Sequence, residues 1–177
     1  TYPPDATYAL RKEHGAMKPP QVMAEIIRFF TKKGELVVDP FAGVGGTLLG
    51  AALAARPSLG FELNPRWVEI YQKIKKDFVL SKGDFNRRSD TTNDSRPLTG
   101  KMRQGDCLPL LQELPSESVA AVITDPPYGI NHGAGGFREE TNFNMLSESQ
   151  QQDLGLASDL GSFLLRLQEI GQEIRRI

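Results

Sequence analysis

Asp125-Pro126-Pro127-Tyr128 combines an acid, two prolines and an aromatic ring directly after the apolar residues 119–123. A β-rich run ending in this way is typical of a buried strand whose carboxyl end stops on a rigid turn. Two prolines fix φ twice and remove two backbone donors, so nearby carbonyls stay free to accept hydrogen bonds. These groups suit a planar ligand that carries an amino group. A simple proline turn with Tyr128 in the core is an equally good interpretation of the tetrapeptide alone.

A glycine-rich stretch, DPFAGVGG at residues 39–46, follows a short β-branched run at residues 35–39. Glycines let the backbone approach a ligand, and the N-terminus of the helix that follows offers unpaired N–H groups. Glu62 lies 19 positions after Gly43, close to the spacing at which an acid binds a ribose hydroxyl. The loop is shorter than the dinucleotide fingerprint, which fits a ligand without a pyrophosphate. A tight strand-to-helix turn without a ligand is the alternative.

Alternating strand and helix patterns surround both stretches and predict an α/β fold. We predict strands at residues 35–39, 58–63, 101–104 and 119–123, and helices at residues 21–30, 48–55, 64–78, 108–114 and 160–177. Residues 1–20, which contain two proline pairs, are predicted to be extended or irregular. In a doubly wound sheet of order 3-2-1-4, strands 1 and 4 part at the switch point where ligands bind. Asp39 and Asp125 end these two strands and are therefore predicted to face one crevice.

Composition sets the remaining bounds. The 177 residues are 39% hydrophobic and 24% charged with a formal net charge of -1, so no global basic field indicates nucleic acid. A single cysteine excludes an internal disulfide and fits a reducing cytoplasm. No apolar run approaches a membrane span, and the N-terminus does not resemble a signal peptide. The polar residues 81–100 are predicted to be a solvated loop, or else a loop whose arginines contact phosphate.

Taken together, the motifs resemble those of S-adenosylmethionine-dependent DNA amino-methyltransferases, which methylate the exocyclic nitrogen of adenine or cytosine. The resemblance is carried by DPFAGVG at 39–45, FELNPRW at 61–67 and DPPY at 125–128, with MKPP at 17–20 and GDC at 105–107. It covers about residues 14–130. It implies S-adenosyl-L-methionine as cofactor and a Rossmann-like doubly wound methyltransferase sheet. Residues 1–177 would form a single, partial catalytic domain.

The resemblance also implies a role for each matched residue on the cofactor side. Glu62 would hold the ribose hydroxyls, Leu63 would pack on the adenine, and Asp106 would accept from the adenine amino group, with Cys107 beside it. Cys107 is interpreted as a packing residue, not a nucleophile. The remaining cofactor residues would be Lys18 and Asp39 near the amino-acid end, and Phe41, Ala42, Gly43 and Gly45 along the methionine and ribose. No metal is required.

On the substrate side, the resemblance implies that Asp125 and the Pro126 carbonyl accept the two hydrogens of the target amine. The nitrogen lone pair would then point at the sulfonium methyl for direct transfer, with catalysis resting on positioning and charge placement. Tyr128 would stack on a base flipped out of DNA, and Pro127 would brace the turn. Asp125 favours adenine over cytosine without deciding between them.

The sequence also departs from the family pattern. Residue 177 ends within the helix that should deliver a fifth strand, so we expect a truncated chain without a target-recognition domain that is inactive by itself. The glycine loop precedes the DPPY motif, which suggests a circularly permuted member. The alternatives are a tRNA guanine-N2 methyltransferase and a non-catalytic cofactor-binding remnant. A glutamine methyltransferase is less favoured, because that family has Asn at the position of Asp125. A bacterial or phage-type cytoplasmic enzyme, in a restriction–modification context, is the expected setting.

Overall fold

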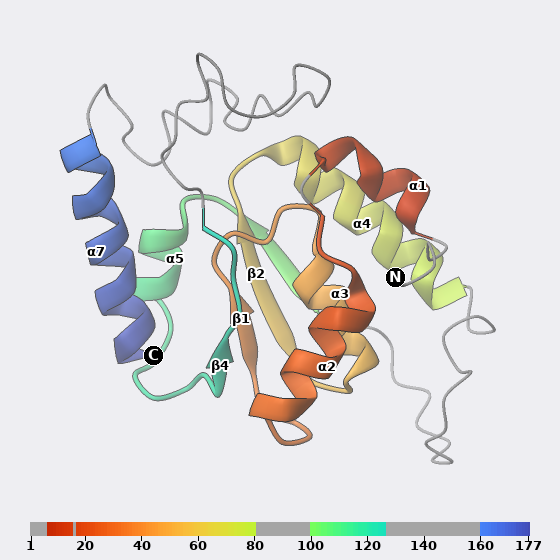
Figure 1. Ribbon diagram of the computed structural model, residues 1–177, viewed down its shortest axis with the longest axis horizontal. Coiled ribbons are helices and arrows are strands. Elements are labelled where there is room, and N and C mark those ends of the chain that lie inside the picture. The colour runs from red at the N-terminus through yellow and green to blue at the C-terminus, as the bar shows by residue number, and fades with distance from the viewer. Residues whose placement is uncertain (1–6, 16, 81–99, 127–159) are drawn as a thin grey trace.

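The computed structural model describes residues 7–15, 17–80, 100–126 and 160–177. In this part of the chain, four strands form one parallel sheet in the order β3-β2-β1-β4 (Figure 1). The strands are β1 (Val37–Asp39), β2 (Ser58–Glu62), β3 (Lys101–Gln104) and β4 (Ala121–Val122). The predicted fold class and strand order are confirmed.

Helices cover both faces of the sheet (Figure 1). One face carries α2 (Pro20–Phe30), α3 (Gly46–Leu53) and α4 (Pro65–Leu80), and the other carries α5 (Cys107–Gln112) and α7 (Leu160–Arg176). Successive side chains of a strand point to opposite faces. Val37 accordingly packs with α2 and α3, whereas its neighbour Val38 packs with α5 and α7. Both valines are fully buried, which explains the continuous apolar character of β1.

The predicted helices form at nearly the predicted residues because their end signals are local. Asn64 caps α4, since its side-chain oxygen accepts a hydrogen bond from the Arg66 amide at 3.0 Å, and Pro65 occupies the first position. Close packing of α3 on α2 depends on Gly50. A Cβ there would lie 2.4 Å from the Cβ of Met23 and 2.9 Å from the Ala24 nitrogen.

Two predictions about local structure need correction. Within residues 1–20, Tyr8–Arg11 forms helix α1 and Lys12–His14 forms the 3-10 helix η1. The proline pairs lie outside these turns and do not interrupt them. The turns are tied to the domain by Arg11, which is buried and donates hydrogen bonds to the Thr7 hydroxyl at 2.8 Å and the Lys18 carbonyl at 3.0 Å.

The fourth strand is shorter than predicted, with only Ala121 and Val122 in regular pairing. Its flanks still follow β1, because the Ala120 amide donates to Leu36 and the Ile123 amide donates to Val38, both at 3.0 Å. The polar loop predicted at residues 81–100 falls, except for Gly100, outside the described residues. Among the described residues, no helix is long and apolar enough to cross a membrane, and no group of three or more potential metal-ligating side chains occurs.

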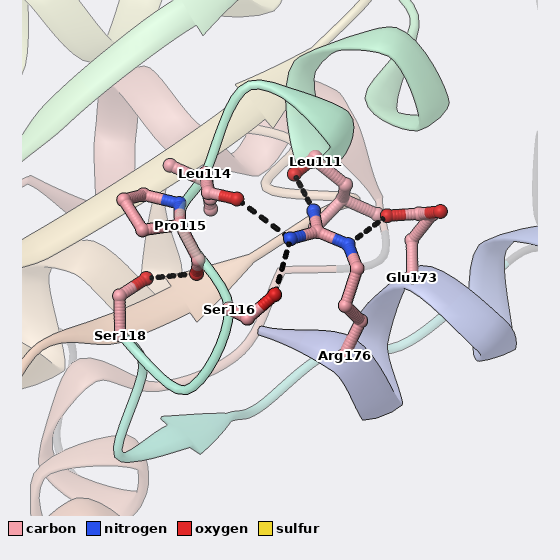
Figure 2. A network of polar contacts seen from close by, with 7 residues as sticks. All are labelled: Leu111, Leu114, Pro115, Ser116, Ser118, Glu173 and Arg176. Carbon is pink, nitrogen blue, oxygen red and sulfur yellow. Dashed lines mark hydrogen bonds and ion pairs between the residues drawn. The ribbon is translucent and has the colours of Figure 1, made fainter.

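Helix α7 is fastened to α5 at its C-terminal end by Arg176 (Figure 2). The guanidinium donates to the carbonyls of Leu111 at 3.0 Å and Leu114 at 2.8 Å, and its Nε donates to Glu173 at 2.6 Å. The Leu111 carbonyl lies in the last turn of α5, where helix carbonyls lack partners within the helix, and the Leu114 carbonyl lies just after it. Arg176 therefore supplies hydrogen-bond donors to carbonyls at the end of α5 while it anchors α7.

Candidate active site

The glycine loop adopts backbone conformations that only glycine takes up easily. Gly43 has φ +51° and Gly45 has φ +80°, and Gly45 is the N-cap of α3. A Cβ at Gly45 would lie 2.2 Å from the ring of Tyr71. That ring is held by its hydroxyl, which donates to the Gly100 carbonyl at 3.1 Å. Position 45 is thus packed against a fixed side chain, and a residue larger than glycine does not fit there without a shift.

Glu62 ends β2 beside this loop and is 8% exposed. Its Oε2 accepts from the Gly43 amide and its Oε1 accepts from the Asn64 amide, both at 2.8 Å. Burial raises the pKa of this carboxyl, and the backbone hydrogen bonds oppose that rise. Each carboxylate oxygen retains a second lone pair for a further donor such as a ribose hydroxyl. Leu63 is half-buried directly after it.

Asp106 follows β3 and caps α5, since its Oδ1 accepts from the Leu108 amide at 2.9 Å. Its Oδ2 forms an ion pair with Arg166 of α7. The neighbouring Cys107 is buried, and burial together with the charge of Asp106 raises the pKa of its thiol to about 12. A thiol held protonated in this way is a poor nucleophile, in agreement with its interpretation as a packing residue.

A hydrogen bond joins the ends of β1 and β4. Asp39 is 1% exposed, and its Oδ1 accepts from the Phe41 amide at 3.1 Å and from the Thr124 hydroxyl at 2.6 Å. Thr124 and Asp39 are 85 positions apart in sequence. The predicted juxtaposition of the glycine loop with the start of the Asp-Pro-Pro motif is therefore present. Sequence reasoning missed Thr124; the available signal was a hydroxyl immediately before the motif.

Beyond Thr124, Asp125 is exposed and Pro126 is half-buried. The other two predicted catalytic residues, Pro127 and Tyr128, lie outside the described residues. On the cofactor side, Phe41 is half-buried, and the buried Ala42 is held by its amide, which donates to the Phe61 carbonyl at 2.9 Å. Of the residues predicted to bind the cofactor, the structure thus brings Glu62 into contact with the glycine loop, which itself contains Phe41 and Ala42.

The segment before α2 packs on the glycine loop. A Cβ at Gly46 would lie 2.7 Å from the Lys18 carbonyl, and one at Gly43 would lie 2.8 Å from Nε2 of His14. Lys18 therefore reaches this region through its main chain. The His14 ring meets Trp67 edge to face with centroids 4.9 Å apart, and its pKa is lowered by burial and by the charge of Lys18. The contacts of His14 with the glycine loop and with Trp67 were not predicted from the sequence.

The donor and acceptor groups fit an adenosine-type ligand. Ribose hydroxyls and an adenine amino group are hydrogen-bond donors, and the acids Glu62 and Asp106 stand after neighbouring strands to accept from them. The glycine loop follows β1 at the switch point between β1 and β4. This combination of sheet, loop and acids defines a Rossmann-like methyltransferase sheet.

Comparison with known proteins agrees with that class. A family model described as DNA methylase matches residues 2–73. A probable tRNA (guanine(10)-N2)-dimethyltransferase from Methanothermococcus thermolithotrophicus is 29% identical over 122 residues, covering 69% of this chain and 67% of that protein. The Type II methyltransferase M.BglI from Bacillus subtilis is 29% identical over 101 residues, covering 57% of this chain and 28% of the relative.

Among solved structures, a putative S-adenosyl-L-methionine-dependent methyltransferase from Methanococcus maripaludis aligns with a TM-score of 0.45 and 13% identity, covering 93% of this chain and 53% of that one. The family match and the Type II relative confirm the resemblance to the amino-methyltransferases and, with it, the predicted cofactor S-adenosyl-L-methionine. The chain spans between about a third and two thirds of the length of the first curated relatives that it matches.

Proposed function

We propose that the protein transfers a methyl group from S-adenosyl-L-methionine to the exocyclic amino group of adenine, or of cytosine, in double-stranded DNA. The observation that carries this proposal is the hydrogen bond from Thr124 to Asp39. It holds Thr124, the residue before the Asp-Pro-Pro motif, beside the glycine loop that follows β1. The DNA methylase model and the Type II methyltransferase relative support DNA as substrate, and a modification enzyme of the restriction–modification kind as the setting.

Cofactor binding would use side chains that the fold has already fixed. Glu62 would accept from the ribose hydroxyls while its two backbone hydrogen bonds keep it in place. Asp106 would accept from the adenine amino group, and Leu63 would pack on the ring. The residues before and within the glycine loop would surround the methionine part: Lys18, Asp39, Phe41, Ala42, Gly43 and Gly45, with Cys107 packing behind Asp106.

The chemistry requires an aromatic amine to act as a nucleophile although its lone pair is delocalised into the ring. Asp125 and the Pro126 carbonyl would accept its two hydrogens, which favours a pyramidal nitrogen. When bound, S-adenosyl-L-methionine supplies a sulfonium methyl, so that a carbon–nitrogen bond forms, the carbon–sulfur bond breaks and the amine releases a proton. Asp125 would receive that proton and pass it to solvent, to which its side chain is exposed. Positioning and charge placement thus supply the catalysis.

A base within a duplex cannot reach such a site, so the target base would have to flip out of the helix. Tyr128 would stack on the flipped base, and Pro127 would brace the turn below it. The exposure of Asp125 is compatible with a large substrate that approaches from solvent. The net charge of -1 implies that the phosphate contacts come from a local basic surface, not from the field of the whole chain.

A second candidate substrate is a guanine in tRNA. Three tRNA (guanine(10)-N2)-dimethyltransferase relatives are 26–29% identical over 66–79% of this chain. The 2-amino group of guanine is also an exocyclic aromatic amine, so the same acceptors would serve. The two substrates therefore share one chemistry and differ in the nucleic acid that delivers the base.

The test is transfer of tritiated methyl from S-adenosyl-L-methionine by the full-length protein to double-stranded DNA and, separately, to unmodified tRNA. We expect label on DNA, and we expect Asp125→Ala to abolish it while affinity for the cofactor stays within about twofold. General acid–base and positioning effects of this kind are worth about 10²–10⁴-fold in rate. Label on tRNA and none on DNA would reject the DNA proposal in favour of the second candidate.

A further inference from the structure

Arg166 connects α7 to the acid that follows β3. Its Nη2 contacts Oδ2 of Asp106, and its Nη1 donates to Glu169, three residues later on the same helix, at 3.2 Å. The side chains of Arg166 and Asp106 are 23% and 34% exposed, so the pair is largely shielded from solvent. Shielded ion pairs keep more of their electrostatic attraction than fully exposed ones.

The two ends of α7 are attached in different ways. The C-terminal end is held by Arg176 (Figure 2) and by the buried Ile170 and Ile177. The carbonyls of Arg176 and of Ile177 just after the helix also accept hydrogen bonds, from the Glu117 amide at 3.0 Å and the Val119 amide at 2.9 Å. Nearer the N-terminus, Leu164 and Leu165 are 54% and 64% exposed. Among the residues here whose side chains are described, Arg166 and the half-buried Leu167 contact the domain.

Asp106 is held from two sides, with a different partner on each oxygen. The Leu108 amide fixes Oδ1 at 2.9 Å, and Arg166 engages Oδ2. A carboxylate oxygen can accept two hydrogen bonds, so each oxygen keeps capacity for one more donor. With both oxygens fixed, the plane of the carboxylate and its unused lone pairs point in one direction before a ligand arrives.

We propose that Arg166 is a positioning residue for the adenine of the cofactor and acts through Asp106. The inference rests on the proposed role of Asp106 as acceptor for the adenine amino group. By holding the carboxylate in one orientation, Arg166 favours a base with an amino group and disfavours hypoxanthine, which presents an oxygen acceptor at the same place. Because α7 is the next described element after the Asp-Pro-Pro motif, Arg166 also links adenine binding to the docking of α7.

The experiment compares two ligands in the full-length protein by titration calorimetry. One is S-adenosylhomocysteine, and the other is the same compound with hypoxanthine in place of adenine. Arg166→Met removes the charge and the donors but keeps the aliphatic stem, and Arg166→Gln is a second variant in case the first does not fold. Glu169→Gln is the matched control, because it removes the charge of the other, exposed partner of Arg166 and leaves the pair of Arg166 with Asp106 in place.

We expect Arg166→Met and Arg166→Gln to weaken S-adenosylhomocysteine binding by about threefold to tenfold, the effect of losing one supporting hydrogen bond. Binding of the hypoxanthine compound should change by less than about twofold, so the preference for adenine falls. Amide hydrogen exchange at residues 164–170 should slow when S-adenosylhomocysteine binds the native protein, and slow less in the Arg166 variants. Glu169→Gln should leave the adenine preference and the exchange response unchanged.

Each other outcome overturns the inference. Unchanged affinity and unchanged preference in the variants would mean that Arg166 serves only the packing of α7. Tighter binding of S-adenosylhomocysteine would mean that Arg166 competes with adenine for Oδ2 of Asp106. If the native protein bound neither compound, the proposed cofactor site would be rejected and this inference with it. Binding by the native protein that Arg166 substitutions do not alter would reject this inference alone.

Discussion

The ends of β1, β2 and β3 differ from the end of β4 in how completely the fold fixes them. On the first side, Glu62 is 8% exposed, and each of its oxygens accepts a backbone amide. The glycine loop beside it packs on Tyr71 and His14. On the other side, β4 has two half-buried residues and lies at one edge of the sheet that the described residues form, and Asp125 after it is exposed. The hydrogen bond from Thr124 to Asp39 ties the second side to the first.

This difference is what the proposed function would require of the two sides. A site for a constant, small cofactor gains from rigidity, because groups fixed in advance lose little entropy when the ligand binds. A site for one base of a large nucleic acid has to stay open to solvent and to admit a flipped nucleotide. We therefore expect substitutions on the first side to affect stability and cofactor affinity, and substitutions on the β4 side to affect turnover.

At the ends of β1, β2 and β3, the largest effect on stability is expected from Gly45→Ala. The new Cβ would lie 2.2 Å from the ring of Tyr71, and alanine would have to adopt φ +80°. Backbone strain and overpacking together should lower the free energy of unfolding by about 2–5 kcal/mol, measured by urea denaturation. Gly171→Ala in α7 is the control, since a Cβ there meets nothing within 4 Å. It should stabilise the protein by about 0.5–1 kcal/mol, and an equal loss in both variants would contradict the argument.

Glu62→Gln tests the ends of β1, β2 and β3 through the affinity for a cofactor analogue. The Glu62 carboxylate accepts hydrogen bonds from two backbone N–H groups, those of Gly43 and Asn64. In glutamine, the NH₂ group would face one of these donors, so one buried hydrogen bond is lost together with the charge. A hydrogen bond to a charged group is worth about 1.5–3 kcal/mol, and we expect S-adenosylhomocysteine to bind about 10–100-fold more weakly by calorimetry. Glu69→Gln on the exposed surface of α4 should leave affinity unchanged. Native affinity in Glu62→Gln would show that this acid does not touch the cofactor.

Thr124→Val probes the connection between the two sides. Valine keeps the shape of the side chain but removes the hydroxyl that donates to Asp39 at 2.6 Å. Asp39 still accepts from the Phe41 amide, so cofactor affinity should change by less than about twofold. We expect single-turnover methyl transfer to slow by about tenfold, the value of one hydrogen bond to a carboxylate. Ser118→Ala removes an exposed hydroxyl ahead of β4 and should have no effect. Weaker cofactor binding with unchanged methyl transfer would contradict this role of Thr124 and would place it with the cofactor-binding groups.

The sequence predicted the fold because its signals are local or periodic. The β-branched run before residue 39, the glycines after it and the Asn64-Pro65 cap each determine structure within a few residues. The acid spacing then placed Glu62 beside Gly43, where the structure has a hydrogen bond between them. The helical residues 8–14 were missed because the proline pairs on both sides suggested an irregular segment, whereas the buried Arg11 holds these turns.

Contacts that depend on tertiary placement were not predictable in the same way. The partner of Asp39 is a hydroxyl 85 residues away, and a hydroxyl has no spacing rule that singles it out. Arg166 pairs with an acid 60 residues earlier, and that contact depends on the docking of α7 on α5, to which Arg176 and the isoleucines contribute. The proposed roles of Pro127 and Tyr128 still rest on the sequence.

The smallest of the expected effects is a pH dependence that measures how well the cofactor side excludes water. Burial raises the pKa of the Cys107 thiol to about 12, whereas an unfolded cysteine titrates near 8.5. As the pH rises above about 8.5, the unfolded state loses a proton that the folded state keeps, so stability must fall with pH. Between pH 8.5 and 9.5 we expect the native protein to lose about 1 kcal/mol more than Cys107→Ala, measured by urea denaturation at each pH. Equal losses would mean that solvent reaches the thiol and that the cofactor side is as open as the end of β4.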